Sequence, residues 1–590
     1  MLNTHCYTIP DLEAFVKLTN EFKFKLRAFH HAHQTYLVPE ILKRAYGGRP
    51  PAAALFADNM YYKAEAYVAS EDAGKILYEN GITPVYVSDN PVLNAQHVKW
   101  EAAKAYRNGL PYHIALAGVT SASAELLGLG ERIGKVKPGY DADIVVWDSD
   151  PLSTGAAPIQ VWIDGTPQFE NPVELQKPAS KPLHLSNVAT TSTKQSEHTN
   201  IIMSGIVKIM LPRQEHIFDG IDRANVVICD GKIVCTGTCN IEIATARSQG
   251  IETMHLEYGH IIPPATAFAS SLGLSEIQAE PDTNDGENSE TSFSRAIDGL
   301  AFDTKQLRTA YSRGVTKAIT APAFKYGGAK GVSAGFLTGA SHALEKGAVW
   351  ADEVALQYTL TQTEKNPALS SHVGLLRSAM LKSFDTNETT ASPEEIYLKH
   401  AALGKLPLAI TMHSADIIAS LLRLKADVEA SSPSKQLIRL IIIGGAESHL
   451  LAPQLAASNT SVLLAPLLPY SESWDQRRSL TGAPLTNGTA IDILHAAGVK
   501  VAIGTKEDWE TRDLFLSAGI ALANGGGKIT EKEALSFVNS NIYDMLGLKQ
   551  SMDGTEFVVF EGSPLGIQGR VRAIADGRGS VTVFGQGAER

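Results

Sequence analysis

The chain has 590 residues, of which 44% are hydrophobic and 19% charged, and its net charge is −11 at pH 7. This composition is ordinary for a globular protein, and the length predicts two to four domains rather than one core. The acidic balance argues against nucleic acid as a partner and leaves small molecules or proteins. No apolar run approaches the roughly 20 residues that cross a bilayer, and no signal peptide is visible. A cytoplasmic location is therefore the default expectation.

The first globular stretch is predicted over residues 1–176 and alternates β-like and helical patterns. Such alternation indicates α/β architecture. The strands and helices expected in this stretch are the strands at 26–32 and 82–91 and the helices at 38–46 and 94–109. The segment "ADIVVWDSDPLSTGAAPIQVWIDG" (142–165) indicates small β-sandwich strands beside the main sheet.

A polar linker is predicted over residues 177–200, where Ser, Thr, Pro and Lys dominate and apolar periodicity is absent. The second globular stretch follows at 201–590. It contains an acidic loop at 279–292, whose composition favours mobility. The elements expected in this stretch are strands at 436–445, 460–466 and 498–505, a helix at 416–430, and sandwich strands within 203–237 and 555–585 around a barrel at 259–545.

Four cysteines in a chain of this length do not make a disulfide framework. Three of them, in "ICDGKIVCTGTC", could be interpreted as a metal cluster. Cys229 and Cys235 lie in short β-like runs on either side of Asp-Gly, which favours a structural role instead. A reducing compartment is the default.

An internal repeat is the strongest sign of how the chain is organised. Three segment pairs match in the same order: 4–18 with 411–425, 76–91 with 493–508, and 115–129 with 534–548. Matches in one order predict two copies of one fold.

The segment "GLGERIGKVKPGYDADIVVWDSDPL…VWIDG" (128–165) resembles the C-terminal signature of the amidohydrolase superfamily. The segments "FADNMYYKAEA", "VSDNP" and "EAAKAYRNGL" resemble its imidazolonepropionase-like branch. The resemblance covers about residues 3–175, and a weaker one covers about 203–590. It implies a (β/α)8 barrel with metal ligands at the carboxyl ends of the strands, where barrel enzymes keep their catalytic groups.

The family pattern has His-x-His after strand 1, one histidine after each of strands 5 and 6, and an aspartate after strand 8. His31 precedes Asp89 by 58 residues, which is room for about two βα units of a barrel that needs about 250 residues. His31 is therefore assigned to strand 6 and Asp89 to strand 8. His5, one unit upstream, is assigned to strand 5.

The resemblance implies that His5, His31 and Asp89 bind a divalent metal ion, for which zinc suits imidazole and carboxylate donors best. Asp89 would also act as the catalytic proton carrier. His30 and His33 are expected to line the site or to bond to groups behind it. Lys63 either reaches the substrate or is a solvated surface lysine.

The first copy starts just before the strand-5 histidine, so strands 1 to 4 and their ligands are not expected within it. An open sheet edge would then favour packing onto the second copy or self-association. In the second copy, Ala269, Ser270 and Ser271 replace His-x-His, while Gly444 and Thr505 replace two further ligands. His413 alone keeps its position. His449, Glu507 and Asp508 are expected to be solvated or to cap helices.

The resemblance implies a tandem amidohydrolase that hydrolyses a carbon–nitrogen bond, other than a peptide bond, in a small amide-type molecule. The loss of ligands predicts that its activity is impaired in this chain. The alternatives are a non-catalytic scaffold or partner-binding protein, and a fragment of a longer enzyme whose first strands are encoded upstream. A deacetylase of N-acetyl sugars is a narrower alternative for the substrate.

Overall fold

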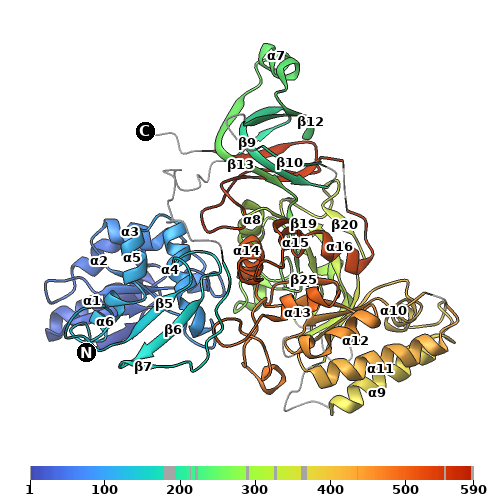
Figure 1. Cartoon of the computed structure of the whole chain (residues 1–590), viewed down its shortest axis with the longest axis horizontal. Coiled ribbons are helices and arrows are strands. Elements are labelled where there is room, and N and C mark those ends of the chain that lie inside the picture. Colours follow the sequence, from blue (N-terminus) through green and yellow to red (C-terminus); the bar gives the residue numbers. More distant parts are fainter. Residues whose placement is uncertain are drawn as a thin grey trace. The chain divides into compact units, whose positions relative to one another are not determined.

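The computed structural model of the protein divides into two compact units, which are coloured along the sequence in Figure 1. The first unit is Met1–Thr190 with two later segments, Ile277–Thr283 and Ala483–Asn487; the rest of the chain forms the second. In the described residues, no helix is long and apolar enough to cross a membrane. The structure describes residues 2–177, 195–212, 214–218, 223–286, 292–324, 328–360, 368–434, 436–550 and 553–585. Most of the predicted linker and the centre of the predicted acidic loop lie outside these ranges.

The first unit is built on a four-stranded parallel sheet in the order β1-β2-β3-β4. Its strands are β1 (Leu2–His5), β2 (Leu26–His30), β3 (Ala52–Leu55) and β4 (Pro84–Tyr86). Helices α1 (Ile9–Phe22), α2 (Pro39–Lys43) and α3 (Ala73–Glu79) lie between successive strands. All four residues of β3 are buried, as expected for an inner strand of a parallel sheet. The alternating α/β pattern predicted for this stretch is confirmed.

Local sequence signals explain where the first helix begins and ends. Thr8 caps α1 by accepting a hydrogen bond from the Asp11 backbone N–H, and a proline lies in the first turn. Lys23 ends the helix in the left-handed conformation, with φ of 55°. The short return to β2 brings the carboxyl ends of both strands to one edge of the sheet.

The remainder of the first unit contains three helices and a small antiparallel sheet, in the order β5-β6-β7. These elements are α4 (Val98–Arg107), α5 (Tyr112–Ala117), α6 (Ser121–Leu126), β5 (Ile144–Trp147), β6 (Pro158–Ile163) and β7 (Thr166–Pro167). Strands β5 and β6 fall within the segment predicted to form sandwich strands.

The second unit contains a nine-stranded sheet whose strands come from both the beginning and the end of this unit. The strand order is β12-β11-β9-β13-β26-β27-β28-β8, and β10 pairs with β9. Its strands are β8 (Gln195–His198), β9 (Ile201–Leu211), β10 (Gln214–Ile217), β11 (Ala224–Cys229), β12 (Lys232–Gly237), β13 (Thr253–Ile262), β26 (Glu556–Glu561), β27 (Arg570–Asp576) and β28 (Val581–Phe584). One apolar core, which includes Met203, Val226 and Phe557, packs against this sheet. The strands expected within 203–237 and 555–585 therefore belong to a single sheet.

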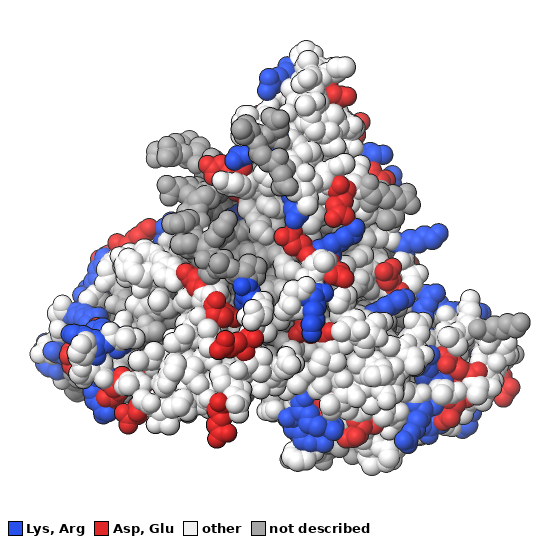
Figure 2. Space-filling view, viewed as in Figure 1, with Lys and Arg blue, Asp and Glu red and all other residues white. Residues whose placement is uncertain are grey.

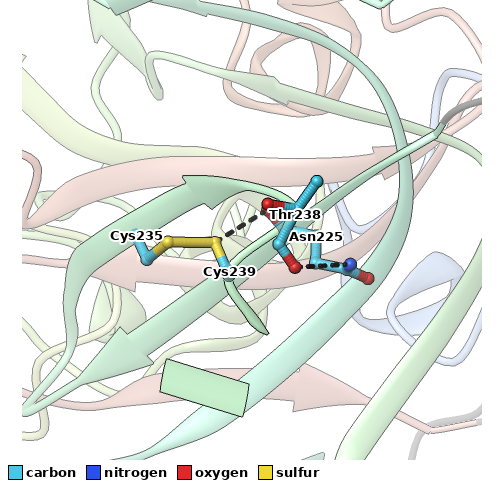
Figure 3. Close-up of a disulfide and its surroundings, with 4 residues drawn as sticks. All are labelled: Asn225, Cys235, Thr238 and Cys239. Carbon is cyan, nitrogen blue, oxygen red and sulfur yellow. Dashed lines mark hydrogen bonds between the residues drawn. A yellow bond between two sulfur atoms is a disulfide. The ribbon is translucent and has the colours of Figure 1, made fainter. Parts of the chain in front are cut away.

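A disulfide joins Cys235, on β12, to Cys239, which immediately precedes α7 (Asn240–Ser248) (Figure 3). The two Cα atoms lie 5.9 Å apart, and the Asn225 side chain donates a hydrogen bond to the Thr238 carbonyl beside them. A cluster of three metal-binding thiolates is thereby ruled out, because two of the sulfur atoms are bonded to each other. A bonded pair is also not what a reducing compartment favours.

Two further sheets occupy the region predicted to be a barrel. The first has the order β14-β16-β19-β20, with β14 (Ala265–Phe268), β16 (Val315–Thr320), β19 (Ala334–Leu337) and β20 (Val349–Ala351). The second contains the parallel run β21 (Leu356–Thr359), β22 (Leu408–Met412), β23 (Leu440–Gly444), β24 (Ser461–Leu464) and β25 (Val501–Ile503). Strands β15 (Ser294–Arg295), β17 (Ala323–Phe324) and β18 (Gly328–Val332) extend its other edge. The Thr505 N–H donates to the Phe268 carbonyl at 3.0 Å, which ties the end of β25 to the end of β14.

Helices of the second unit follow the strands in the manner of an α/β protein. They are α8 (Lys305–Ser312), α9 (Leu369–Ser383), α10 (Pro393–Ala402), α11 (Ala415–Ser431), α12 (Ala452–Ala457), α13 (Ala490–Ala496), α14 (Leu514–Asn524), α15 (Glu531–Ser536) and α16 (Ser540–Leu546). The inner core contains Phe268, Ile441, Ile443 and Leu463, contributed by three different strands. On the face shown in Figure 2, acidic and basic side chains are interspersed over the described residues.

The prediction of a regular (β/α)8 barrel over 259–545 is wrong in one part. Strand β19 runs antiparallel to β16, whereas every neighbouring pair in such a barrel is parallel. A parallel connection needs a crossover of a dozen or more residues, usually a helix. The chain between β16 and β19 instead forms the antiparallel pair β17 and β18, so β19 returns beside β16 in the opposite direction.

Candidate functional site

The three residues predicted to bind metal lie at the carboxyl ends of strands in the first unit. His5 is the last residue of β1 and pairs in register with His30, the last residue of β2. His31 follows directly, and Asp89 follows β4 after two residues. His31 and Asp89 both have φ of 49°, a left-handed conformation that is uncommon outside glycine. Such backbone conformations cluster at functional sites.

The structure brings these side chains together. His31 Nε2 lies 3.4 Å from Asp89 Oδ2. The His5 ring centroid lies 4.8 Å from that of His31 and 5.4 Å from that of His30. Strands 58 residues apart in sequence therefore present one cluster of imidazoles and a carboxylate.

Burial lowers the pKa of three of the histidines, His30, His31 and His33, and so favours their neutral form. It lowers the pKa of His31 to about 4, an effect that the nearby His5 reinforces and Asp89 opposes. Burial also lowers the pKa of His33 to about 3 and lowers that of His30. His31 Nδ1 and His33 Nε2 are buried without a hydrogen-bond partner. Neutral imidazole is the form that binds metal ions.

The donor set of two imidazoles and one carboxylate fits zinc in kind. In the described ranges, however, no group of three His, Cys, Asp or Glu side chains is arranged to hold a metal ion. The structure thus shows a close pair, His31 and Asp89, with His5 beside it rather than a finished three-ligand site.

Aromatic side chains that the sequence analysis did not single out surround this cluster. The Tyr7 ring stacks on His31 with centroids 5.1 Å apart, and Phe56 lies 5.2 Å from His31. His33 is stacked on Phe56 at 6.0 Å. Tyr7 comes two residues after His5, and Phe56 comes directly after β3. Their positions just beyond strand ends were the one sign in the sequence that they could lie near the site.

Lys63 lies beside the same cluster. Its Nζ is 3.8 Å from the Tyr7 ring centroid and 5.2 Å from that of Tyr62. Its side chain is half-buried, so Lys63 is not a fully solvated surface lysine.

A buried carboxylate that the sequence analysis missed holds the chain after β3. Glu101 on α4 is 2% exposed, and its Oε2 accepts hydrogen bonds from the backbone N–H groups of Ala57 and Asp58. Burial and the neighbouring Asp58 raise the pKa of Glu101 well above its usual range. Lys104 pairs with Asp58. This arrangement fixes the turn that carries Phe56.

The strand ends of the second unit carry different side chains. His413 follows β22, and its buried Nδ1 has no hydrogen-bond partner. Gly444, at the end of β23, has φ of 88°, and a Cβ there would lie 2.6 Å from His413 Cε1. A side chain at Gly444 would be strained by the backbone conformation and would force the His413 ring to move. Thr505 follows β25 and is 2% exposed.

The segment Ala269–Ser271 follows β14, and the Ser271 hydroxyl donates to Asp508 Oδ2 at 2.9 Å. Burial raises the pKa of Asp508 to about 7. Glu507 caps the short helix Asp508–Asp513 through a reciprocal pair of hydrogen bonds with Glu510, as predicted. A solvated role is wrong for His449, which is buried, and for Asp508, whose carboxylate bonds to Ser271. Both lie beside buried strand ends.

Comparison with known proteins shows what this chain is similar to. Residues 96–169, which lie in the first unit, match the amidohydrolase family model. The chain is 47% identical over 592 aligned residues to "Amidohydrolase tasK" of Hapsidospora irregularis, an alignment that covers 93% of this chain and 60% of that protein. The chain therefore spans less than two thirds of that relative's length.

A solved structure shares the fold. The amidohydrolase from Thermotoga maritima is 17% identical, covers 64% of this chain and 98% of its own, and superimposes with a TM-score of 0.52. An adenosine deaminase from Xanthomonas campestris with bound zinc is 13% identical over 64% of this chain and 92% of its own, with a TM-score of 0.33. The first likeness supports a mixed α/β fold of amidohydrolase type, and the second is too small to bear on the site.

Proposed function

We propose that this chain is a metal-dependent hydrolase of carbon–nitrogen bonds other than peptide bonds, with its site in the first unit. The observation that carries the proposal is the contact of His31 with Asp89, and of His5 with His31, at neighbouring strand ends. The same unit contains the amidohydrolase family segment at 96–169.

In this proposal, His5, His31 and Asp89 hold one divalent ion, for which zinc suits the donors. The bound ion would polarise a substrate carbonyl and lower the pKa of a bound water to about 7. Asp89 has a half-exposed side chain, so Oδ2 can accept a proton and release it to a leaving nitrogen. His31 and His33 stay neutral and exclude water on the buried side. The substrate is a small amide-type molecule.

We infer a second, non-catalytic role for the second unit. In the alignment with the family pattern, Ala269, Ser271, Gly444 and Thr505 stand where that pattern has metal ligands, and His413 is the ligand-type residue kept at these positions. A side chain at Gly444 would be strained by the backbone and would displace the His413 ring. The missing ligand-type side chains are what support a scaffold or partner-binding role in this proposal.

Zinc binding tests both proposals together. The purified chain, stripped of metal and titrated with zinc in a calorimeter, should bind one ion. His31→Ala should weaken binding by at least about 100-fold, because loss of even an outer-shell partner costs 10- to 100-fold. His413→Ala is the matched control and should leave affinity unchanged. A variant pattern in which His413→Ala abolishes binding and His31→Ala does not would overturn the proposal, as would two tightly bound ions.

Hydrolysis provides the second readout. Zinc-loaded chain should release amine from a panel of small amides, and His31→Ala should lose that release together with the metal. If wild-type chain binds zinc but hydrolyses nothing in the panel, the non-catalytic interpretation extends to both units.

A further inference from the structure

A lysine and two tyrosines form a second polar group beside the candidate metal site, and nothing in the proposed chemistry uses them. The hydroxyls of Tyr7 and Tyr62 lie 3.0 Å apart. Lys63 Nζ lies over the Tyr7 ring at 3.8 Å. We call Tyr7, Tyr62 and Lys63 the Lys–Tyr cluster.

The Lys–Tyr cluster adjoins the proposed metal ligands through a single ring. One face of Tyr7 is stacked on His31, and the Lys63 ammonium contacts the same ring. Tyr62 lies edge-on to His33 at 6.4 Å. A small molecule that reaches His31 therefore passes within reach of Lys63.

The charge of Lys63 is not neutralised by a carboxylate in the described part of the chain. Asp89, the acidic group of the site, is paired with His31 instead. Lys63 lies over the rings of Tyr7 and Tyr62 and also hydrogen-bonds to the Tyr62 hydroxyl. An ammonium has three N–H donors, so donors remain for a ligand. Contact with a ring face stabilises an ammonium by about 0.5 to 2 kcal/mol and leaves its N–H donors for another acceptor.

The hydroxyl pair also keeps a donor for a ligand. One hydroxyl donates to the other, and the accepting hydroxyl still has its own proton, because a phenol is protonated at neutral pH. An ammonium and a hydroxyl on one side of a site match the two oxygens of a carboxylate.

We propose that the Lys–Tyr cluster binds a carboxylate of the substrate, so that the chain acts on amides that carry a carboxylate a few bonds from the scissile carbon–nitrogen bond. This inference rests on the proposed function, since it names the substrate class of the same site. Lys63 contributes the charge, and Tyr7 and Tyr62 hold its side chain and supply a hydroxyl donor.

Binding of a matched probe pair tests this. The probes are N-acetylglycine, which has a carboxylate, and N-acetylglycinamide, in which a neutral amide replaces it. Affinity is measured by calorimetry on the full chain, with and without zinc. Wild type should bind the carboxylate about 10- to 100-fold more tightly, the ratio expected when a hydrogen bond to a charged group is lost. Lys63→Met should reduce that preference to about twofold, and Lys63→Arg should restore it.

Controls separate the subsite from the metal site. Lys17→Met removes an exposed lysine of the same unit and should leave the preference intact. Tyr62→Phe keeps the ring and should weaken carboxylate binding less than Lys63→Met does. Retention of the full preference in Lys63→Met, with zinc content and circular dichroism unchanged, would overturn the carboxylate subsite while leaving the proposed hydrolase untouched. Absence of zinc binding together with a Lys63-dependent preference would overturn the hydrolase instead.

Discussion

The strand ends of the first unit carry imidazoles and a carboxylate in contact, whereas those of the second unit carry one isolated imidazole. Gly444, at the end of the neighbouring strand β23, packs against His413, and Thr505 follows β25 further along the sheet. Neither Gly444 nor Thr505 has a ligand-type side chain. Both units nevertheless keep parallel strands with buried apolar residues. The comparison teaches that buried apolar side chains are enough to maintain a parallel sheet. The ability to bind a metal ion or a substrate depends instead on the few side chains at the carboxyl ends of the strands.

The largest expected effect comes from the interiors themselves. Phe29 on β2 and Phe268 on β14 are both fully buried. Phe29→Ala should lower the unfolding free energy of the first unit by about 3 to 5 kcal/mol, and Phe268→Ala should do the same to the second. Urea unfolding followed by hydrogen exchange of peptides from each unit would measure both.

We expect each substitution to destabilise only the unit that contains it. Phe29→Ala should leave exchange in β21–β25 unchanged, and Phe268→Ala should leave exchange in β1–β4 unchanged. Loss of protection across both units from either single substitution would show that they unfold together.

A smaller difference is expected between two buried carboxylates that hold backbone N–H groups. Glu447, fully buried, accepts hydrogen bonds from the backbone N–H of Ala415 and from the Arg478 guanidinium. Burial by itself would raise the pKa of Glu447, but the bonds and charge of Arg478 hold it below its usual range. Glu101 in the first unit has no such arginine, and its pKa is raised by burial and Asp58.

Replacement by glutamine should distinguish the charged carboxylate of Glu447 from the carboxyl of Glu101, whose charged form is disfavoured. At pH 7, Glu447→Gln should cost about 2 kcal/mol, because hydrogen bonds to a charged group are lost. Glu101→Gln should cost less than Glu447→Gln, because burial and Asp58 disfavour the charged form of Glu101 and the amide oxygen can still accept from Ala57. Urea midpoints at pH 7 decide this, and equal costs at both positions would contradict the assigned charge states.

Sequence patterns predicted much of the fold because burial and periodicity are local signals. The buried run before Gly444 and the alternation around β2 were both visible as apolar segments. The reversal at β19 was not, since it depends on how the hairpin β17–β18 packs. A strand sequence does not encode the direction of its partner.

The candidate site was predicted as far as side-chain type and spacing allow. His5, His31 and Asp89 are indeed neighbours, because parallel strands place their carboxyl ends at one edge. Tyr7, which stacks on His31, could not be found this way. Aromatic residues are most often core, and only the positions of the neighbouring rings show that this one faces the histidines.

The disulfide gives a further test, confined to the second unit. Replacing Cys235 and Cys239 by serine should lower the unfolding free energy of this unit by about 2 kcal/mol, since the closed loop is short. Dithiothreitol should shift wild-type unfolding by the same amount and leave the double variant unaffected. Cys229→Ser is the matched control, because Cys229 is a free thiol on the adjacent strand. A wild-type protein indifferent to reductant would show that the bond contributes nothing.

The last expected effect is a change in the pH dependence of stability at Asp508, whose carboxylate accepts a hydrogen bond from Ser271 just after β14. Burial raises the pKa of Asp508 from 3.8 to about 7, so the folded chain holds a proton there that the unfolded chain releases. Stability from this group is therefore complete below about pH 4 and is lost as the pH rises through 7. Asp508→Asn, which stays neutral, should make the unfolding free energy of the second unit fall less between about pH 5 and about pH 8 than in wild type. The exposed Asp544 provides the control, since Asp544→Asn should leave that difference unchanged. A parallel decline in wild type and Asp508→Asn would show that Asp508 is ionised when folded, and that this strand end is more hydrated than its packing suggests.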